Sequence, residues 1–144
     1  MKNYSIIVLL MATLWSNCLS AENAADPVDV VIQITNIEKP VGSLRLAIYA
    51  DETTYLNNAY ESMKAKATGD TQTLVFKNIP RGVFAVSVHH DVNDNDQFDT
   101  GLFGRPIEPY GFSNNARGTF GPAKWEDAKF EVTGQIKTIS IELR

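Results

Sequence analysis

The residues best suited to chemistry lie in one short acidic segment. Between residues 91 and 99, every second side chain carries oxygen, giving the set Asp91, Asn93, Asn95, Gln97 and Asp99. Calcium takes six to eight oxygen ligands, and an alternating Asp/Asn loop with a main-chain carbonyl at its seventh position supplies several of them. The segment therefore predicts a calcium site, with Gln97 contributing its carbonyl. The alternative is a turn in which these side chains bond their own backbone.

The predicted site lacks one ligand that such loops normally have. Counted from Asp91, the twelfth position is Leu102, where a bidentate Glu is expected. Further charge must therefore come from a more distant carboxylate, and the candidates are Glu108, Glu126 and Asp127. His90 adjoins the first ligand and is expected to support it by hydrogen bonding. His89 points to the opposite face of the same predicted strand, so the two histidines cannot share an ion.

Aromatic residues concentrate between residues 100 and 125, where periodicity is lost. Long segments without regular structure are uncommon inside a domain, and disordered segments are poor in rings. We expect this segment either to fill a small satellite core or to present a surface for a sugar or peptide. The predicted surface consists of Phe103, Tyr110, Phe112, Asn114, Asn115 and Trp125.

No pairing of a nucleophile with a base is visible in the sequence. Ser113 lies in no nucleophile-elbow motif, and neither histidine belongs to an H-E-x-x-H motif. A hydrolase would have to combine His90 with one of the three distant carboxylates. We therefore expect a protein that is not an enzyme.

The elements around the acidic segment read as strands. Apolar residues alternate with mostly polar ones over 28–35, 43–50, 71–77, 83–89, 128–133 and 136–143. The first two stretches are expected to form an adjacent pair. Between residues 51 and 67, Leu56, Tyr60 and Met63 recur at helical spacing after capping residues, which predicts one short crossover helix. Together the elements predict an all-β, antiparallel β-sandwich.

The N-terminus has the order of a secretory signal peptide. Lys2 precedes ten apolar or small residues, too few to span a bilayer, and a small-residue region follows. We expect cleavage after Ala21, a tether at 22–27 and a single domain at 28–144 in a periplasmic or secreted protein. Lipidation at Cys18 is the alternative, disfavoured by the bulky and polar residues before it.

Charge restricts the expected partners. The chain has a formal net charge of −4 and no cluster of Lys or Arg. This argues against nucleic acid or an anionic membrane as the partner. No later apolar run is long enough to span a bilayer, so we expect an extracellular or periplasmic ligand.

The second half of the chain contains a distinctive string of motifs, namely His90-Asp91-x-Asn93-x-Asn95, Phe98-Asp99-Thr100, Gly104-x-Pro106-x-Glu108, Tyr110-Gly111-Phe112-Ser113-Asn114-Asn115-Ala116, Phe120-Gly121-Pro122 and Glu126-Asp127-Ala128-Lys129-Phe130. With these motifs the chain resembles an uncharacterised secreted bacterial family, domain of unknown function 2141. The resemblance implies an immunoglobulin-like or transthyretin-like β-sandwich and no established activity. The family usually has glycine where Asp96 and Pro109 stand. Asp tolerates the left-handed turn at a modest cost, and Pro109 restricts Glu108 to extended conformations.

These observations lead to one hypothesis and two alternatives. The leading hypothesis is an exported, non-catalytic binding or structural module whose acidic loop, filled by calcium, organises the aromatic segment. The first alternative is a carbohydrate- or peptide-binding domain that uses the aromatic residues of 103–125. The second, with less support, is a hydrolase that uses His90 and a carboxylate.

Overall fold

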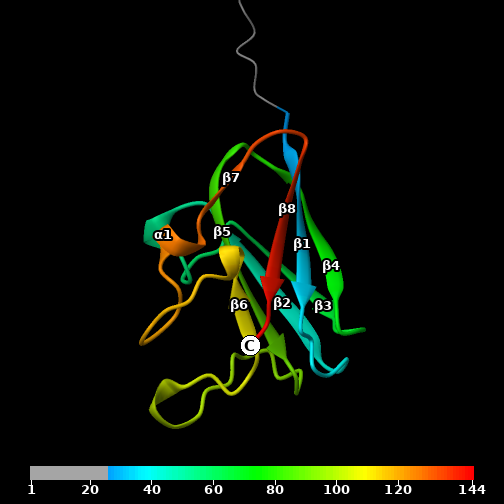
Figure 1. Ribbon diagram of the computed structural model, residues 1–144, viewed down its shortest axis with the longest axis vertical. Coiled ribbons are helices and arrows are strands. Elements are labelled where there is room, and N and C mark those ends of the chain that lie inside the picture. The colour runs from blue at the N-terminus through cyan, green and yellow to red at the C-terminus, as the bar shows by residue number, and fades with distance from the viewer. Residues whose placement is uncertain (1–25) are drawn as a thin grey trace, which may run out of the picture.

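The protein is an all-β fold of eight strands in two sheets, seen in a computed structural model that describes residues 26–144 (Figure 1). The predicted signal peptide, Cys18 and most of the predicted tether lie outside the described residues. Among the residues that are described, no helix combines the length and the apolar character needed to cross a membrane.

The smaller sheet has the strand order β4-β1-β8. Its members are β1 (Val28–Thr35), β4 (Gln72–Ile79) and β8 (Ile136–Glu142). β1 pairs with β4 in antiparallel and with β8 in parallel register. The sequence had predicted a purely antiparallel sandwich, and the parallel pairing of β1 with β8 corrects that prediction. Parallel neighbours need a long connection, and here most of the domain separates the first strand from the last.

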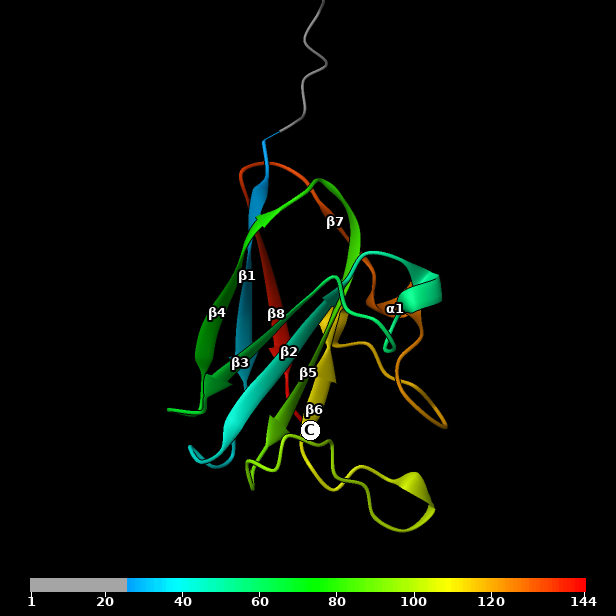
Figure 2. The same cartoon turned by 180° about the vertical axis from the view of Figure 1, so that it is seen from behind.

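The larger sheet has the order β3-β2-β5-β6, and β7 pairs with the beginning of β5. Figure 2 shows this sheet from its outer side. Its members are β2 (Ser43–Tyr49), β3 (Glu61–Lys66), β5 (Gly82–Asp91), β6 (Tyr110–Phe112) and β7 (Phe130–Val132). β1 and β2 thus lie in different sheets, and the predicted adjacent pairing of these two stretches is wrong.

Burial on both faces makes β5 the central strand. Phe84, Val86 and Val88 face the main core between the sheets, together with Ile32 of β1 and Leu46 of β2. The opposite face of β5 carries Ala85 into a second, smaller core. A strand covered on both sides is held rigidly, which matters because the acidic loop begins where β5 ends.

The predicted crossover helix is wrong. Asp51 does cap a turn, accepting a hydrogen bond from the Thr53 N–H at 2.7 Å, but the turn is a single 3-10 turn over Glu52–Thr54. The chain then passes through Leu56 at φ 61°, which ends any helical path. Residues 61–66 form β3 beside β2, with alternating half-buried and exposed side chains. The apolar residues fit a helical spacing, but this part of the chain forms a strand because it pairs with β2.

The aromatic segment is ordered by short elements. It contains 3-10 turns at Leu102–Gly104 and Ser113–Asn115, strand β6, and the single-turn helix α1 (Trp125–Ala128). The Ser113 Oγ accepts a hydrogen bond from the Val86 N–H at 2.9 Å. This buried contact fixes the middle of the segment to β5.

Candidate metal centre

The acidic loop leaves the sheet at a tightly packed position. Asp91 is the last residue of β5 and lies opposite Ser43 at the start of β2. Gly42, at φ 68°, packs so closely here that a Cβ atom at this residue would lie 2.1 Å from the Asp91 carbonyl oxygen. The turn between the sheets therefore requires glycine and fixes the first residue of the loop.

Asp91 is the organising side chain of the loop. It is fully buried. One carboxylate oxygen accepts the Asn95 N–H at 3.1 Å, and the other accepts the Asp96 N–H at 2.9 Å. The Arg45 guanidinium lies 3.6 Å away. Burial of this charge is thus offset by two main-chain donors and a nearby cation.

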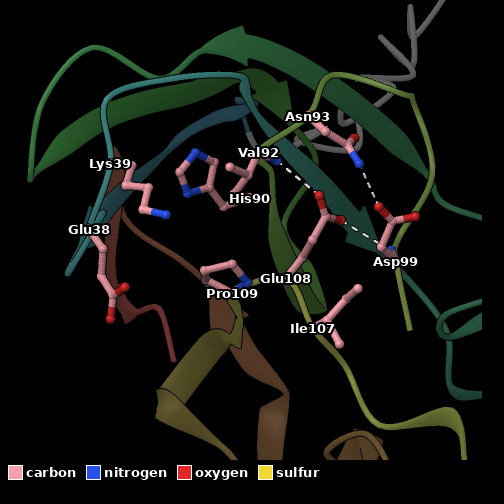
Figure 3. A pocket seen from close by; sticks show the side chains of 9 residues that line it. All are labelled: Glu38, Lys39, His90, Val92, Asn93, Asp99, Ile107, Glu108 and Pro109. Atoms are coloured by element: carbon pink, nitrogen blue, oxygen red, sulfur yellow. Dashed lines mark hydrogen bonds between the residues drawn. The ribbon is translucent and has the colours of Figure 1, made fainter. Parts of the chain in front are cut away.

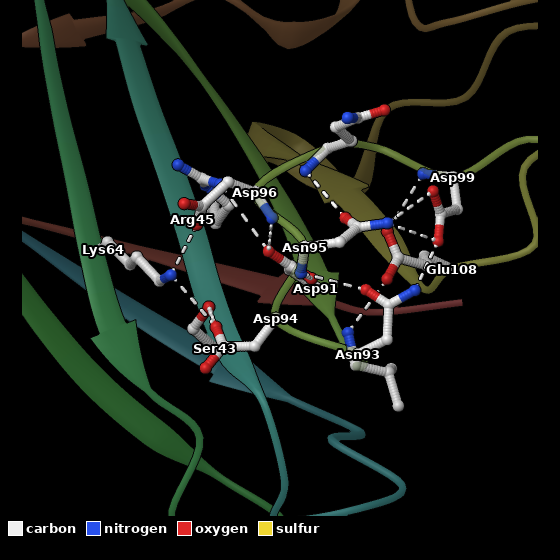
Figure 4. Close-up of polar contacts among 12 residues, drawn as sticks. Ser43, Arg45, Lys64, Asp91, Asn93, Asp94, Asn95, Asp96, Asp99 and Glu108 are labelled. Carbon is white, nitrogen blue, oxygen red and sulfur yellow. Dashed lines mark hydrogen bonds and ion pairs between the residues drawn. The ribbon is translucent and has the colours of Figure 1, made fainter.

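The two asparagines turn the loop and point toward Asp99. The Asn93 Oδ1 accepts the Asn95 N–H at 3.1 Å, and the Asn95 Oδ1 accepts the Gln97 N–H at 2.9 Å. Their amide nitrogens both donate to the Asp99 carboxylate, from 2.7 Å and 3.0 Å. Figure 4 shows these side chains gathered around one place inside the loop. Three of the predicted ligands, Asn93, Asn95 and Asp99, therefore lie together, and the asparagines also form the backbone-bonded turn that was the alternative.

The sharp turn expected at Asp96 is present. Asp96 has φ 65° and Asp94 has φ 60°. Both lie in the left-handed region that glycine adopts most easily and that Asp visits at a modest cost. Asp at this position therefore does not prevent the turn.

One half of the loop is neutralised by the neighbouring strands. Lys64 of β3 lies 3.0 Å from the Asp94 carboxylate and 2.5 Å from that of Asp96, and Arg45 lies 2.8 Å from Asp96. Ser43 donates to Asp94 at 2.7 Å. Hydrogen bonds from Ser43 and Lys64 hold the pKa of Asp94 below its usual value, and the Lys64 ammonium does the same for Asp96.

No local pattern in the sequence indicates that Arg45 and Lys64 pair with the loop. Asp91, Asp94 and Asp96 bring oxygen atoms within 4.8 Å of one another, spacing that would suit a metal ion. Arg45 and Lys64 already balance that charge. Their role depends on the pairing of β2 with β3, which places Arg45 beside Lys64.

The other half of the loop has carboxylates without cations. Glu108 is buried, and its two oxygens accept the N–H groups of Val92 at 2.9 Å and Asp99 at 3.1 Å. In the part of the chain that the structure describes, the Asp99 carboxylate accepts hydrogen bonds only from the two asparagine amides. Within residues 26–144, no Lys or Arg lies at ion-pair distance from either carboxylate. Of the three distant carboxylates proposed from the sequence, Glu108 is therefore the one that contacts the loop.

Glu126 and Asp127, the other two distant candidates, lie elsewhere. Both belong to α1, which packs beside β5 away from the loop in Figure 1. Glu126 forms an ion pair with Lys129 at 2.6 Å. Their assignment as metal ligands or supporting residues is therefore not met by the geometry.

A cavity of about 310 Å³ opens beside Asp99 and Glu108 (Figure 3). It is lined by Glu38, Lys39, His90, Val92, Asn93, Asp99, Ile107, Glu108 and Pro109. The His90 ring is buried, and its Nε2 lies 2.7 Å from the Val41 carbonyl oxygen. A carbonyl only accepts, so Nε2 carries the proton and donates. His90 therefore anchors the turn before β2.

His89 faces the outer side of the sheet, as the strand alternation predicted. Its ring packs against Phe98 with 5.2 Å between the ring centres. Burial lowers the pKa of His89 below its ordinary value. His89 thus belongs to an aromatic cluster with Phe98, apart from the oxygen atoms of the loop.

The predicted contact surface is not assembled. Phe112 and Trp125 are buried in the second core, where Trp125 packs edge-on against Tyr55 at 5.6 Å. Asn114 donates to the Lys129 carbonyl at 2.8 Å, and Asn115 accepts the Glu142 N–H at 2.9 Å. Tyr110 is half-buried and Phe103 is exposed on a different loop. These six residues therefore do not form one exposed platform.

The family model described as an uncharacterized protein conserved in bacteria, DUF2141, matches residues 32–140. The chain belongs to this family. The matched range includes every strand except the first residues of β1 and the last residues of β8, and it contains the whole acidic loop. Neither the curated proteins nor the solved structures include a match. The resemblance inferred from the motifs is thus confirmed.

Proposed function

We propose that this protein is an exported, non-catalytic structural or binding module whose acidic loop binds calcium. The observation that carries the proposal is the half of the loop containing Asp99 and Glu108. The buried Glu108 carboxylate accepts the main-chain N–H of Asp99 there, and among the described residues no Lys or Arg lies at ion-pair distance from either acidic side chain. Like charges brought together in a partly buried site repel one another, and a divalent cation removes that cost.

The donor set fits calcium by its chemistry. Asp91, Asn93, Asn95, Asp99 and Glu108 all offer oxygen, and Gln97 adds a main-chain carbonyl. Each oxygen that accepts one backbone N–H keeps a further lone pair for a metal. A hard cation with six or more oxygen ligands matches such a loop better than a metal that prefers imidazole or thiolate. When bound, calcium would be held by Asp99 and Glu108 together with the oxygen atoms of the loop and would neutralise the charge of the two carboxylates.

The surroundings of His90 support a non-catalytic role. A general base needs access to its substrate, whereas this ring is buried and one nitrogen is committed to the Val41 carbonyl. Among the described residues, His90 forms no hydrogen bond with a carboxylate. A hydrolase that used this histidine would first have to release it from the turn.

Thermal unfolding tests the calcium proposal. We expect the melting temperature to be about 4 °C higher in millimolar calcium than in EDTA, since weak extracellular sites bind in the 10⁻⁴ to 10⁻³ M range and a ligand of the folded state stabilises it. Asp99→Ala should abolish the rise. Glu126→Ala, which removes an exposed carboxylate away from the loop, should keep it. Equal melting temperatures of the wild type in calcium and in EDTA would refute calcium binding.

We further propose that the two sheets have an immunoglobulin-like or transthyretin-like topology and that the protein is periplasmic or secreted. The arrangement of the strands in two sheets, with the first and the last strand paired in parallel in the smaller sheet, supports the topology. The signal-peptide pattern at the N-terminus supports the compartment. N-terminal sequencing of the purified exported protein would test it, with Glu22 expected as the first residue.

A further inference from the structure

The segment between the two unpaired carboxylates projects from the sandwich and ends in apolar side chains. We call residues 100–107 the apolar tip. Leu102 is 84% exposed, Phe103 99% and Ile107 68%. Figures 1 and 2 show this segment extending beyond the end of the sandwich where β5 finishes. Large apolar side chains gathered on an exposed projection mark an interaction site more often than a chance exposure.

Hydrogen bonds within the tip satisfy much of its backbone. Gly101 donates its N–H to the Arg105 carbonyl at 2.7 Å, Gly104 donates to Gly101 at 3.2 Å, and Ile107 donates to Asp99 at 3.1 Å. A backbone with internal partners loses less when it leaves water for an apolar medium. Phe103 holds φ 61°, so the chain keeps an uncommon conformation at the residue whose ring is most exposed.

Charge along the tip differs from charge at its base. Between Thr100 and Ile107 there is no Asp or Glu, and Arg105 is the single charged residue. Asp99 and Glu108 stand at the base, on either side. An apolar end with an arginine suits the boundary where lipid headgroups carry phosphate. The carboxylates at the base would repel anionic lipids until a cation neutralises them.

We propose that the apolar tip inserts into the surface of a phospholipid bilayer, with calcium at Asp99 and Glu108 permitting the attachment. The inference rests on the proposed function, because calcium neutralises the two carboxylates at the base of the tip. The chain's overall negative charge disfavours anionic membranes, but that charge does not extend to the tip. A convex, isolated tip with its backbone bonded internally fits a fluid lipid surface, which needs no matching groove.

Vesicle sedimentation tests the proposal with the full exported protein. The vesicles contain phosphatidylethanolamine with a minority of phosphatidylglycerol. We expect binding in millimolar calcium, loss of binding in EDTA, and a reduction of about tenfold or more for Phe103→Ser, since burying one large apolar side chain accounts for at least that factor. Phe120→Ser is the matched control, because Phe120 is equally exposed on a different loop. Its vesicle binding should equal that of the wild type.

Melting temperatures separate the two proposals. Phe103→Ser should keep the full calcium-dependent rise in melting temperature, because the ring contacts none of the proposed ligands. A wild type that is stabilised by calcium but does not sediment with vesicles would overturn the lipid inference and leave the calcium proposal standing. Equal loss of binding in the Phe103 and Phe120 variants would also overturn it. Binding unaffected by EDTA, with no calcium-dependent rise in melting temperature, would overturn both.

Discussion

The acidic loop has two halves that carry the same kind of side chain but meet different neighbours. Asp94 and Asp96 face Lys64 of β3, at 3.0 Å and 2.5 Å. Within residues 26–144, Asp99 and Glu108 accept hydrogen bonds only from N–H groups of the backbone and of two asparagines. A carboxylate's sequence position thus says little about whether its charge is balanced. The difference arises because one half lies over β2 and β3, and the other lies beside the projecting segment.

The two halves of the loop are expected to have different roles. Exposed ion pairs contribute little to stability on their own, so the pairs made by Lys64 mainly fix the direction of the loop. In the other half, no cation of the described residues lies at ion-pair distance, so we expect an added cation to lower the free energy most there. Asp91, buried between them, accepts hydrogen bonds that shape both halves.

Replacing Asp91 should have the largest effect and should damage both halves together. Asp91→Ala leaves the N–H groups of Asn95 and Asp96 without their acceptor, which we expect to cost about 3 kcal/mol in the free energy of unfolding. Urea unfolding measures this loss. Asp91→Asn, which keeps one acceptor oxygen, should lose less. If both variants unfold at the wild-type urea concentration, Asp91 does not organise the loop.

Replacing Glu108 should separate the halves by their response to calcium. Glu108→Gln retains the side chain's shape but removes the charge, so we expect it to lose most of the roughly 1–2 kcal/mol that millimolar calcium adds to a weak site. Asp94→Asn alters the neutralised half and should keep that gain. Calorimetric titration with calcium measures both. A larger loss of calcium stabilisation in the Asp94 variant than in the Glu108 variant would mean that calcium binds the half of the loop containing Asp94.

Acid should act on the neutralised half. The pKa values of Asp94 and Asp96 lie below the ordinary 3.8 in the folded protein, so their ion pairs contribute stability fully above pH 3.8 and lose it as pH falls through the lowered values. We expect the wild type to lose more stability between pH 5 and pH 2.5 than Lys64→Met, in urea titrations with EDTA. Parallel losses in the two proteins would mean that Lys64 does not set these pKa values.

The smallest effect is expected at Asp96. Asp96→Gly relieves the left-handed conformation at φ 65° but removes the contacts with Lys64 and Arg45. These changes oppose each other, and we expect a melting temperature within about 2 °C of the wild type in EDTA. A melting temperature more than 5 °C below that of the wild type would show that the ion pairs of Asp96 contribute more to stability than expected for exposed ion pairs.

Local patterns predicted much of this fold. The alternation in β1, β2, β4 and β8 follows from one face of each strand packing against the main core, and it is visible in the sequence because successive side chains point to opposite faces. β5, buried on both faces, appears instead as a nearly continuous apolar run. β3 was not predicted, because Leu56, Tyr60 and Met63 also fit a helical spacing. β6, with three residues, is too short to show a period.

The sequence by itself determined the spacing of oxygen ligands from Asp91 to Asp99, because a loop that bonds its own backbone depends on neighbours in the chain. Only the tertiary structure decided which distant groups join it. Glu108 reaches the loop and Glu126 does not, and Lys64 neutralises one half because β3 lies beside β2. Such contacts are set by strand pairing across many residues, which no local pattern records.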